Sequence, residues 1–273
     1  MLIVLIFSSI LTLSALEWEL FETNIYHLVI RNNTMWKIRE DVVNNPAGGR
    51  LPYIWDESIQ QWKVNPDAYG VYLAVGQTSV YIFNYNKLLF VKPKDYLPTT
   101  FVYCSQNGND IKIGFNDHIW FVSTTAIIGG FTVNKFNPTT NSLTPVPGVG
   151  AVKVAPTPDD KAWVVNDSGQ ILRYDGTNWN LMPGNAKDIY VGANDIPFIV
   201  STTIVDGGYE IMKWNDTAYQ WEVLEGIGGI SLALDDRDNP HIITSNYSVY
   251  RPKKGVILNF CSSIKIFKIV NFD

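Results

Sequence analysis

An internal repeat is the feature that most constrains the fold of this chain. The clearest unit, Lys187 to Gly226, contains four short β-prone segments separated by turn residues. Six units follow one another, and the residues that open their second strands are Trp36, Tyr81, Trp120, Trp163, Pro197 and Pro240. These residues are 45, 39, 43, 34 and 43 positions apart, near the period of propeller blades, which is about 40 to 45 residues. The sequence therefore predicts an all-β fold, a β-propeller with six blades of four antiparallel strands.

The two ends of the repeat predict how the ring closes. The sixth unit lacks a Trp-x-Leu fourth strand, and Trp18-Glu19-Leu20 has that pattern. Pairing an N-terminal strand with the last blade removes an exposed sheet edge. We therefore expect the β-propeller domain over residues 16–252. Residues 253–273 form a β-prone tail of unknown structure that can instead supply the closing strand. Five blades stay an alternative to six.

Residues 1–15, MLIVLIFSSILTLSA, have the pattern of a secretory signal peptide, although no Lys or Arg precedes the apolar run. The alternative is an uncleaved anchor. A cleaved signal predicts a secreted protein, or one in the lumen of the secretory–endosomal pathway, without a membrane span. In that compartment Cys104 and Cys261 either form a disulfide or stay two buried thiols. It also makes glycosylation plausible at the four Asn-x-Ser/Thr sites, which begin at Asn32, Asn166, Asn215 and Asn246.

Composition excludes two classes of protein. Of the 273 residues, 46% are hydrophobic and 17% charged, which argues against a disordered chain. The net charge is −5, and Lys253-Lys254 is the one short basic run. Nucleic-acid binding normally needs a basic face, so a nucleic-acid partner is not expected.

Motifs for catalysis or metal binding are not found in the sequence. It has no Gly-x-Ser-x-Gly, His-Glu-x-x-His or Gly-rich phosphate loop. His27, His118 and His241 lack metal-ligand spacing, and the acidic turns Asp159-Asp160 and Asp235-Asp236 are more typical of turns than of calcium loops. We expect no enzyme, no catalytic residue, no metal and no cofactor. One alternative stays open, because carboxylates far apart in sequence can meet at the centre of a propeller.

The fourth unit carries a resemblance to a known family. It contains Trp163-Val164-Val165, Ile171-Leu172-Arg173-Tyr174-Asp175-Gly176 and Trp179-Asn180-Leu181-Met182-Pro183-Gly184. This pattern resembles the tectonin β-propeller repeat, and the similarity is good over about residues 110–251 and faint over 18–100. Tectonin-type proteins include secreted lectins that recognise microbial glycans or lipopolysaccharide, and intracellular propellers that act as interaction platforms. A shared fold does not itself set the function.

The resemblance implies a secreted carbohydrate-binding protein whose partners are glycans, including microbial surface saccharides. Aromatic rings stack on sugar rings, and carboxylates and amides bind hydroxyl groups. Such residues recur beside loops, and the candidate ligand-binding residues are Trp179, Trp221, Asp175, Asn194 and Asn215. Trp120 and Trp163, inside apolar strands, are expected in the core. The alternatives are a protein-binding propeller scaffold without a sugar site and, third, a propeller hydrolase or lyase.

Overall fold

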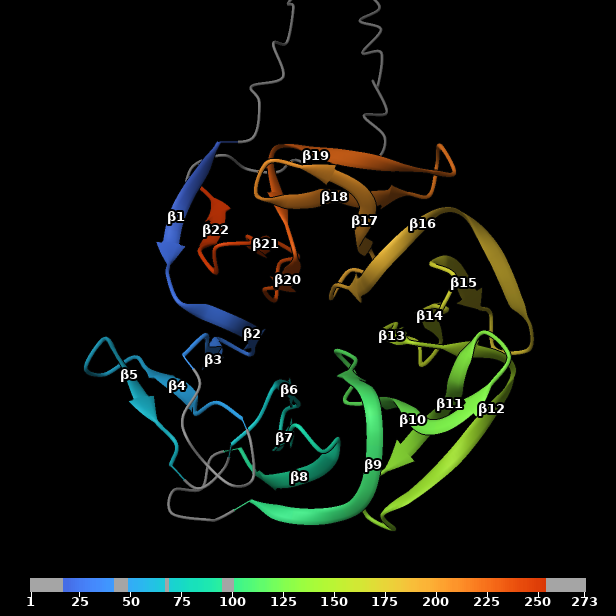
Figure 1. Cartoon of the computed structure of the whole chain (residues 1–273), viewed down its shortest axis with the longest axis horizontal. Helices are drawn as coiled ribbons and strands as arrows, with labels where there is room; N and C mark the ends of the chain where they lie inside the picture. Colours follow the sequence, from blue (N-terminus) through green and yellow to red (C-terminus); the bar gives the residue numbers. More distant parts are fainter. Residues whose placement is uncertain (1–16, 42–48, 67–68, 95–100, 254–273) are drawn as a thin grey trace, which may run out of the picture.

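The computed structural model describes residues 17–41, 49–66, 69–94 and 101–253. Within these ranges the chain forms 22 β-strands and no helix, so the predicted all-β class is confirmed. The strands form curled sheets around a common middle (Figure 1). No helix in these ranges is long and apolar enough to cross a membrane. The signal peptide, the tail and Cys261 lie outside the described residues, and those predictions stay predictions.

The first half of the ring contains one sheet of four strands and one of seven. The four strands pair in the order β2 (Ile25–Arg31), β3 (Thr34–Arg39), β4 (Pro52–Asp56) and β5 (Gln61–Val64). The seven strands pair in chain order: β6 (Tyr72–Val75), β7 (Ser79–Phe83), β8 (Leu88–Pro93), β9 (Val102–Ile113), β10 (Ile119–Ile127), β11 (Gly130–Asn137) and β12 (Ser142–Ala151). The long strand β9 pairs first with β8 and, from Gly108 onward, with β10. It thus belongs to two groups of four strands.

The second half repeats this arrangement. Seven strands again pair in chain order: β13 (Lys153–Pro156), β14 (Ala162–Val165), β15 (Gln170–Tyr174), β16 (Trp179–Val191), β17 (Pro197–Val205), β18 (Gly208–Asn215) and β19 (Gln220–Gly229). The long strand β16 pairs first with β15 and, from Ala186 onward, with β17. The last sheet contains β20 (Ser231–Leu234), β21 (Pro240–Ile243), β22 (Val249–Pro252) and β1 (Trp18–Glu22).

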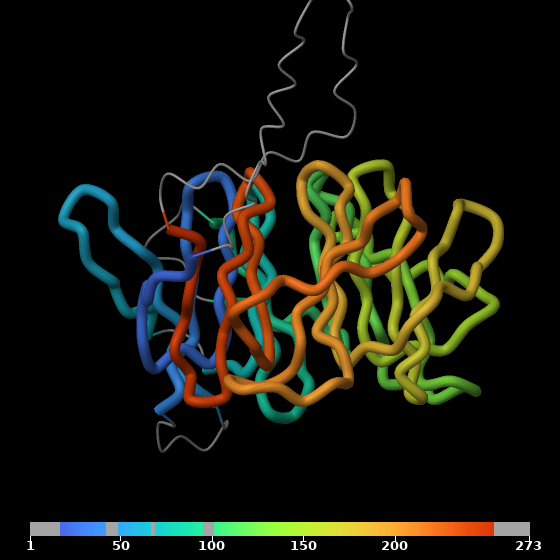
Figure 2. Tube along the Cα trace, turned by 90° about the horizontal axis from the view of Figure 1, so that it is seen from above, coloured from blue at the N-terminus to red at the C-terminus, as the bar shows by residue number. Residues whose placement is uncertain are grey.

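The two ends of the described chain meet in that last sheet. Strand β1 pairs antiparallel with β22, so that Trp18 lies opposite Pro252 and Leu20 opposite Tyr250. Just outside the pair, Lys253 N donates to Glu17 O at 2.9 Å. Figure 2 shows these two ends side by side, one blue and one red. The edge of β22 is thereby covered by a strand from the other end of the chain.

The core lies between the sheets, as repeat proteins usually bury it. Buried apolar residues form six clusters, and each cluster joins neighbouring groups of strands. Trp120 and Trp163 are 0% and 1% exposed, which confirms their predicted place in the core. One detail differs from the sequence prediction. In the ladders, Phe198 and His241 hold the positions that Trp120 and Trp163 hold, one residue after the prolines taken as markers.

Candidate functional site

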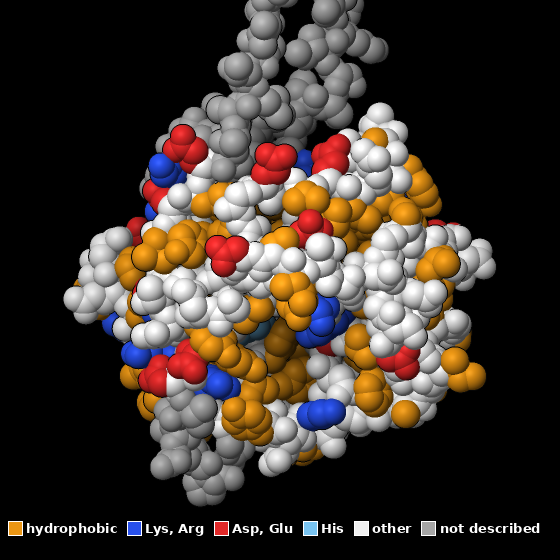
Figure 3. Space-filling view, turned by 45° about the horizontal axis from the view of Figure 1, so that its top comes forward, with side chains coloured by type: hydrophobic (Ala, Val, Ile, Leu, Met, Phe, Trp, Pro, Cys, Tyr) orange, Lys and Arg blue, Asp and Glu red, His pale blue; other side chains and the backbone are white. Residues whose placement is uncertain are grey.

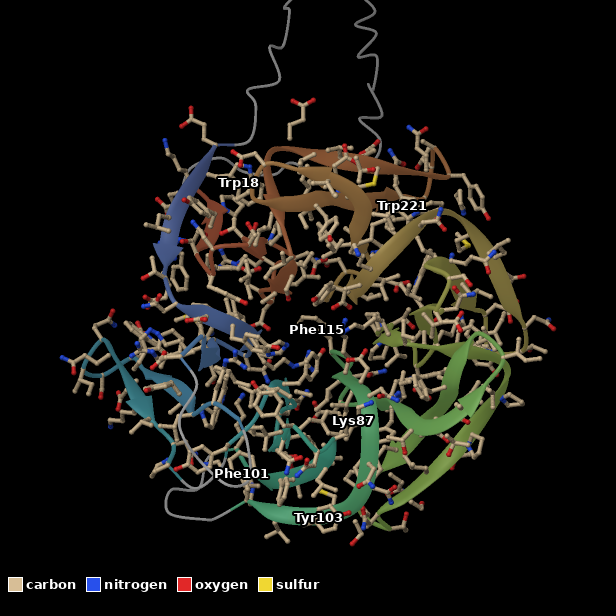
Figure 4. The ribbon with its side chains drawn as sticks, in the orientation of Figure 1. Trp18, Lys87, Phe101, Tyr103, Phe115 and Trp221 are labelled. Atoms are coloured by element: carbon tan, nitrogen blue, oxygen red, sulfur yellow. The ribbon has the colours of Figure 1, made fainter. Side chains whose placement is uncertain are left out.

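The two predicted tryptophans bridge neighbouring groups of strands at the outside of the ring. Trp179 Nε1 donates to Pro147 O in β12 at 3.0 Å, and Trp221 Nε1 donates to Pro183 O in β16 at 2.8 Å. Trp18 Nε1 makes the equivalent bond to Glu225 O in β19 at 3.0 Å. We call these three bonds the rim bridges. Figure 4 shows Trp18 and Trp221 far from the middle of the ring.

Each rim bridge rests on a bulge that the sequence provides. The residue after each acceptor carbonyl is a glycine with positive φ, namely Gly148 (109°), Gly184 (85°) and Gly226 (82°). A side chain is strained in that conformation. A Cβ at Gly148 would also lie only 3.1 Å from Trp179 Cδ1. The recurring Trp and Pro-Gly pattern is therefore explained by packing between neighbouring groups of strands.

The three predicted polar residues lie in three separate turns. Asp175 Oδ1 accepts hydrogen bonds from Thr177 N and Asn178 N, at 2.8 and 2.7 Å. Asn215 Oδ1 accepts one from Ala218 N at 3.0 Å. Asn194 N donates to the Asp238 carboxylate at 3.1 Å, which ties two turns together. These contacts are those of turn residues, and a role in ligand binding stays a prediction.

The acidic turns act in the same way. Asp117, Asp160, Asp195 and Asp238 all have positive φ, between 59° and 65°, at equivalent turn positions. The Asp117 carboxylate accepts two bonds from Gln77 N, at 2.9 and 3.1 Å, across to the preceding group of strands. Turn geometry and bonds between neighbouring groups thus account for the carboxylates of Asp117, Asp160 and Asp238.

A different set of polar residues meets at the middle of the molecule. One residue from each of the six innermost strands makes up this polar ring: His27 (β2), Tyr72 (β6), Asp110 (β9), Lys153 (β13), Asp188 (β16) and Ser231 (β20). They hold one register position, since each is paired with an apolar residue of the next strand, respectively Ile38, Phe83, Val122, Val165, Val200 and Ile243. His27, Asp110 and Asp188 are 7%, 0% and 8% exposed. Burying charged groups is costly unless they are paired.

Two members of the ring, Lys153 and Ser231, and two adjoining side chains, Lys112 and Tyr190, form a network centred on Asp188. Lys112 Nζ lies 2.7 Å from Asp188 Oδ1, and Lys153 Nζ lies 3.5 Å from Asp188 Oδ2. Tyr190 OH donates to Asp188 Oδ2 at 2.9 Å and also lies 2.9 Å from Ser231 Oγ. Asp188 is therefore fully engaged, and its network reaches from β9 to β20.

The other half of the ring is less fully bonded. The rings of His27 and Tyr72 are 4.2 Å apart, and Asp110 Oδ2 accepts a bond from Val154 N at 2.9 Å. His27 Nδ1 and Asp110 Oδ1 are buried without a hydrogen-bond partner among the described residues. A buried polar atom left unpaired costs about 1–3 kcal/mol. The Tyr72 hydroxyl interacts with the Asp110 carboxyl group, so His27 Nδ1 is the atom of the ring most clearly left for a polar ligand or water.

Burial and the neighbouring lysines shift the pKa values of His27, Asp110 and Asp188 in different ways. Burial, with the positive charges of Lys153 and Lys112, lowers the pKa of His27 to about 3, so its imidazole is neutral. Burial raises the pKa of Asp110, although the two lysines oppose the shift. Burial acts on Asp188 in the same direction, but Lys112 and Lys153 outweigh it and hold its pKa below the ordinary value. The two carboxyl groups thus differ in character.

A cavity of about 100 Å³ adjoins the ring. Its walls come from all six innermost strands and include His27, Tyr72, Lys112 and Tyr190. At the other end of the cavity lie Phe115 and Arg31, with the guanidinium 4.2 Å from the centre of the phenyl ring. Figure 4 shows Phe115 near the middle, and Figure 3 shows a hollow in the middle of one face.

The sequence prediction missed this ring, although it left a signal. A polar residue stands nine or ten positions before the second-strand residues Trp36, Tyr81, Trp120, Trp163, Phe198 and His241. In β6, β13 and β20 this residue is the first of a strand that is otherwise apolar. This polar position is hard to detect in the sequence because a different residue occupies it in nearly every unit.

Comparison with known proteins gives the fold. No family model matches the chain, and no curated protein matches it. Among solved structures it is similar to "YCF48 bound to D1 peptide", with a TM-score of 0.56 and 13% identity over 89% of this chain and 98% of that one. It is also similar to a "putative 6-phosphogluconolactonase" from Bacteroides fragilis, with a TM-score of 0.50 and 12% identity over 81% of this chain and 77% of that one. At such identities the likeness shows the β-propeller fold alone.

Proposed function

We propose that this chain is a non-catalytic binding propeller that takes a saccharide at the polar ring. The observation that carries the proposal is the unpartnered buried atom His27 Nδ1 in the wall of a cavity, with Asp110 Oδ1 behind that wall beside Tyr72. A hydroxyl group both donates and accepts hydrogen bonds. It can donate to His27 Nδ1 and accept from a tyrosine or from Lys112, all of which line the cavity, and this suits a ring of mixed donors and acceptors.

The site moves from the rim, where the sequence pattern suggested it, to the middle. Trp179 and Trp221 already use their indole N–H groups within the fold. The polar ring, in contrast, combines polar groups with the apolar wall residues Val29, Ala74 and Ala233. Ligand sites in proteins have this composition, with apolar walls and a few placed polar groups. A saccharide offers both C–H faces and hydroxyl groups to such a site.

Hydrolysis is the rival for the same site. Two carboxyl groups whose pKa values are pushed in opposite directions, as for Asp110 and Asp188, resemble an acid and base pair. Against this, Lys112, Lys153 and Tyr190 occupy the carboxylate of Asp188. A base or nucleophile needs a free lone pair toward its substrate, so binding without turnover is the better match.

A protein-binding scaffold is the second candidate function. The tips of the β10–β11 and β17–β18 hairpins expose apolar side chains, with Ile128 98% and Ile204 78% exposed. One structural neighbour is described as bound to a peptide. Exposed apolar groups of this kind often mark interaction surfaces.

The finer features of the fold and the location of the protein belong to the same proposal. Six blades closed by the N-terminal strand are supported by six innermost strands, six core clusters and the β1–β22 pairing. The kinship to tectonin repeats rests on the sequence pattern. Secretion rests on residues 1–15. Of the four glycosylation sites, Asn166 is 8% exposed and donates its Nδ2 to Gln170 at 2.9 Å, so we expect it to be unmodified.

A glycan array tests the proposed function. We expect the purified protein to retain at least one saccharide, Asp110→Asn to lose most of that retention, and Trp179→Leu to keep it. No retained glycan, or retention that Asp110→Asn leaves unchanged, would contradict the proposal. Release of sugar from the retained glycan would show hydrolysis instead.

A further inference from the structure

Building on the proposed function, we infer that the saccharide at the middle of the molecule ends in a uronic acid, whose carboxylate binds Arg31 and whose hydroxyl groups enter the cavity toward His27. Three features of the cavity carry this inference: the charge of its wall, an unused donor of Arg31, and the position of His27 on the same strand. Together they name the chemistry of the terminal sugar, its orientation and its stoichiometry.

The wall of the cavity carries positive charge. Arg31 and Lys112 line it, and no Asp or Glu of the described residues does. Lys112 Nζ lies 2.7 Å from Asp188 Oδ1 and donates to Ile189 O, so two of its three donors are used within the fold. Arg31 is therefore the cation of the wall that is best able to hold an anionic group.

The guanidinium of Arg31 is fixed in place with one donor unused. Its Nη2 donates to Gly114 O at 2.8 Å and lies 3.5 Å from Asp117 Oδ1, and the group lies 4.2 Å from the centre of the Phe115 ring. Its Nε is buried without a hydrogen-bond partner in the described ranges, and the side chain is 4% exposed. A buried donor without a partner is costly, and a ligand acceptor that reaches Nε removes this cost.

The acidic residues near Arg31 do not take the place of such a ligand. The Asp117 carboxylate is 32% exposed and already accepts two bonds from Gln77 N. Asp236 acts on Arg31 from farther away and accepts bonds from two backbone N–H groups at residues 32–33. Neither residue lines the cavity. A ligand carboxylate at Nε would form a charge-assisted bond, about twice as strong as a bond to a neutral hydroxyl group.

The position of His27 gives the ligand its orientation. His27 and Arg31 line the cavity from one side of β2, four residues apart, which is about 13 Å along a strand. In a uronic acid the carboxylate and the glycosidic bond flank the ring oxygen, and the other hydroxyl groups lie on the opposite edge. With the carboxylate at Arg31, this edge faces His27 Nδ1, which is buried without a partner in the described ranges. A hydroxyl group can donate to this nitrogen or accept from it.

The size and position of the cavity limit the ligand to one terminal sugar per chain. A volume of about 100 Å³ holds a few water-sized groups, which is enough for the hydroxyl edge of one sugar. The glycosidic bond then lies at the end of the cavity near Arg31 and Phe115, the residue that Figure 4 labels near the middle, and the rest of the glycan stays outside. All six innermost strands contribute to the wall, so the cavity occurs once in the ring.

Calorimetric titration with matched pairs of methyl glycosides tests this inference. Each pair contains a uronic acid and its neutral sugar: methyl α-glucuronide with methyl α-glucoside, and the corresponding galacto and manno pairs. We expect at least one uronic acid to bind with a stoichiometry of one, and at least ten times more tightly than its neutral partner. Arg31→Gln should abolish this preference and leave the neutral sugar within about twofold of its wild-type affinity.

Arg39→Gln is the matched control. Arg39 lies in the neighbouring strand β3, its side chain is 38% exposed and 2.8 Å from Asp41 Oδ1, and it does not line the cavity. The preference for the uronic acid should be unchanged in this variant. Acetate carries the carboxylate without the sugar and should bind at least ten times more weakly than the uronic acid. Equal binding of acetate overturns the inference, because the anion alone would then account for the site.

The outcomes separate the inference from the proposed function. Equal or tighter binding of the neutral sugars, or a stoichiometry above one, overturns the inference while a saccharide site remains. If no member of any pair binds and the glycan array is also blank, the proposed function itself is wrong. If Arg31→Gln fails to fold, Arg31→Lys takes its place, because an ammonium group can still donate to Gly114 O but has no Nε. It should weaken the uronic acid several-fold, and unchanged affinity contradicts the inference.

Discussion

The rim and the middle of this propeller use the repeat in opposite ways. At the rim, the same residue type recurs, and Trp18, Trp179 and Trp221 all donate to a carbonyl of the preceding group of strands. In the middle, one register position carries a histidine, a tyrosine, two aspartates, a lysine and a serine. The rim tryptophans are bonded to backbone carbonyls, while among the described residues of the middle His27 Nδ1, Asp110 Oδ1 and Arg31 Nε are buried without a hydrogen-bond partner.

This difference teaches how to interpret a repeated sequence. Each junction between neighbouring blades presents the same packing problem, and identical residues solve it. A ligand on the ring axis would break that equivalence, because each blade would meet a different part of it. A residue type that recurs at the same position of every unit therefore indicates packing between blades. A position that is polar in every unit, but occupied by different residues, indicates a binding site.

Among changes at the rim, removal of the closing strand should lower the stability of the protein most. Deleting Trp18–Glu22 removes every β1–β22 pair and the Trp18 bridge, and it exposes the edge of β22 to other molecules. We expect a loss of several kcal/mol in the free energy of unfolding and a rise in aggregation. Thermal melts with light scattering measure both. An unchanged melting temperature would mean that another segment closes the ring.

A single rim bridge should have a smaller effect. Trp221→Leu removes the 2.8 Å bond to Pro183 O and contacts with Trp163 and Trp214. We expect the free energy of unfolding to fall by about 2 kcal/mol, measured by urea denaturation. Leu181→Ala is the control in β16, the strand that accepts the bond, because Leu181 is 62% exposed, and it should change stability by less than about 0.5 kcal/mol. An equal loss of unfolding free energy in both variants would contradict a structural role for the bridge.

The sequence predicted the fold better than it predicted the candidate site. Alternating strands, turn residues and the Trp-x-Leu pattern at residue 18 depend on local chemistry, and they predicted the all-β class and the strand that pairs with β22. The markers Pro197 and Pro240 were one residue early, because proline opens those strands without sharing the register of Trp120. The ring brings together residues as distant in sequence as His27 and Ser231 (Figure 1), which no local pattern shows. Recurrence drew attention to Trp179 and Trp221 instead.

The buried His27 of the polar ring should make the free energy of unfolding depend on pH. The pKa of His27 is about 3 in the fold against an ordinary value of 6.5, so its neutral form stabilises the fold. This contribution is complete above pH 6.5 and is lost as the pH falls toward 3, by about 1.4 kcal/mol per pH unit. We expect His27→Gln to flatten the dependence of unfolding free energy on pH by about one proton. His118→Gln, whose side chain is 51% exposed, is the control, and an unaltered slope for His27→Gln would contradict the buried, neutral imidazole.

The most direct test of the division between rim and middle crosses two variants with two measurements. Trp221→Leu and Asp110→Asn are each measured for free energy of unfolding and for affinity toward the saccharide that the wild-type protein retains. We predict that Trp221→Leu lowers stability and keeps the affinity within about twofold, a difference of roughly 0.4 kcal/mol. Asp110→Asn should lower the affinity at least tenfold at a smaller cost in stability. The opposite pattern, with affinity lost at Trp221 and kept at Asp110, would place the binding site on the rim and contradict this account.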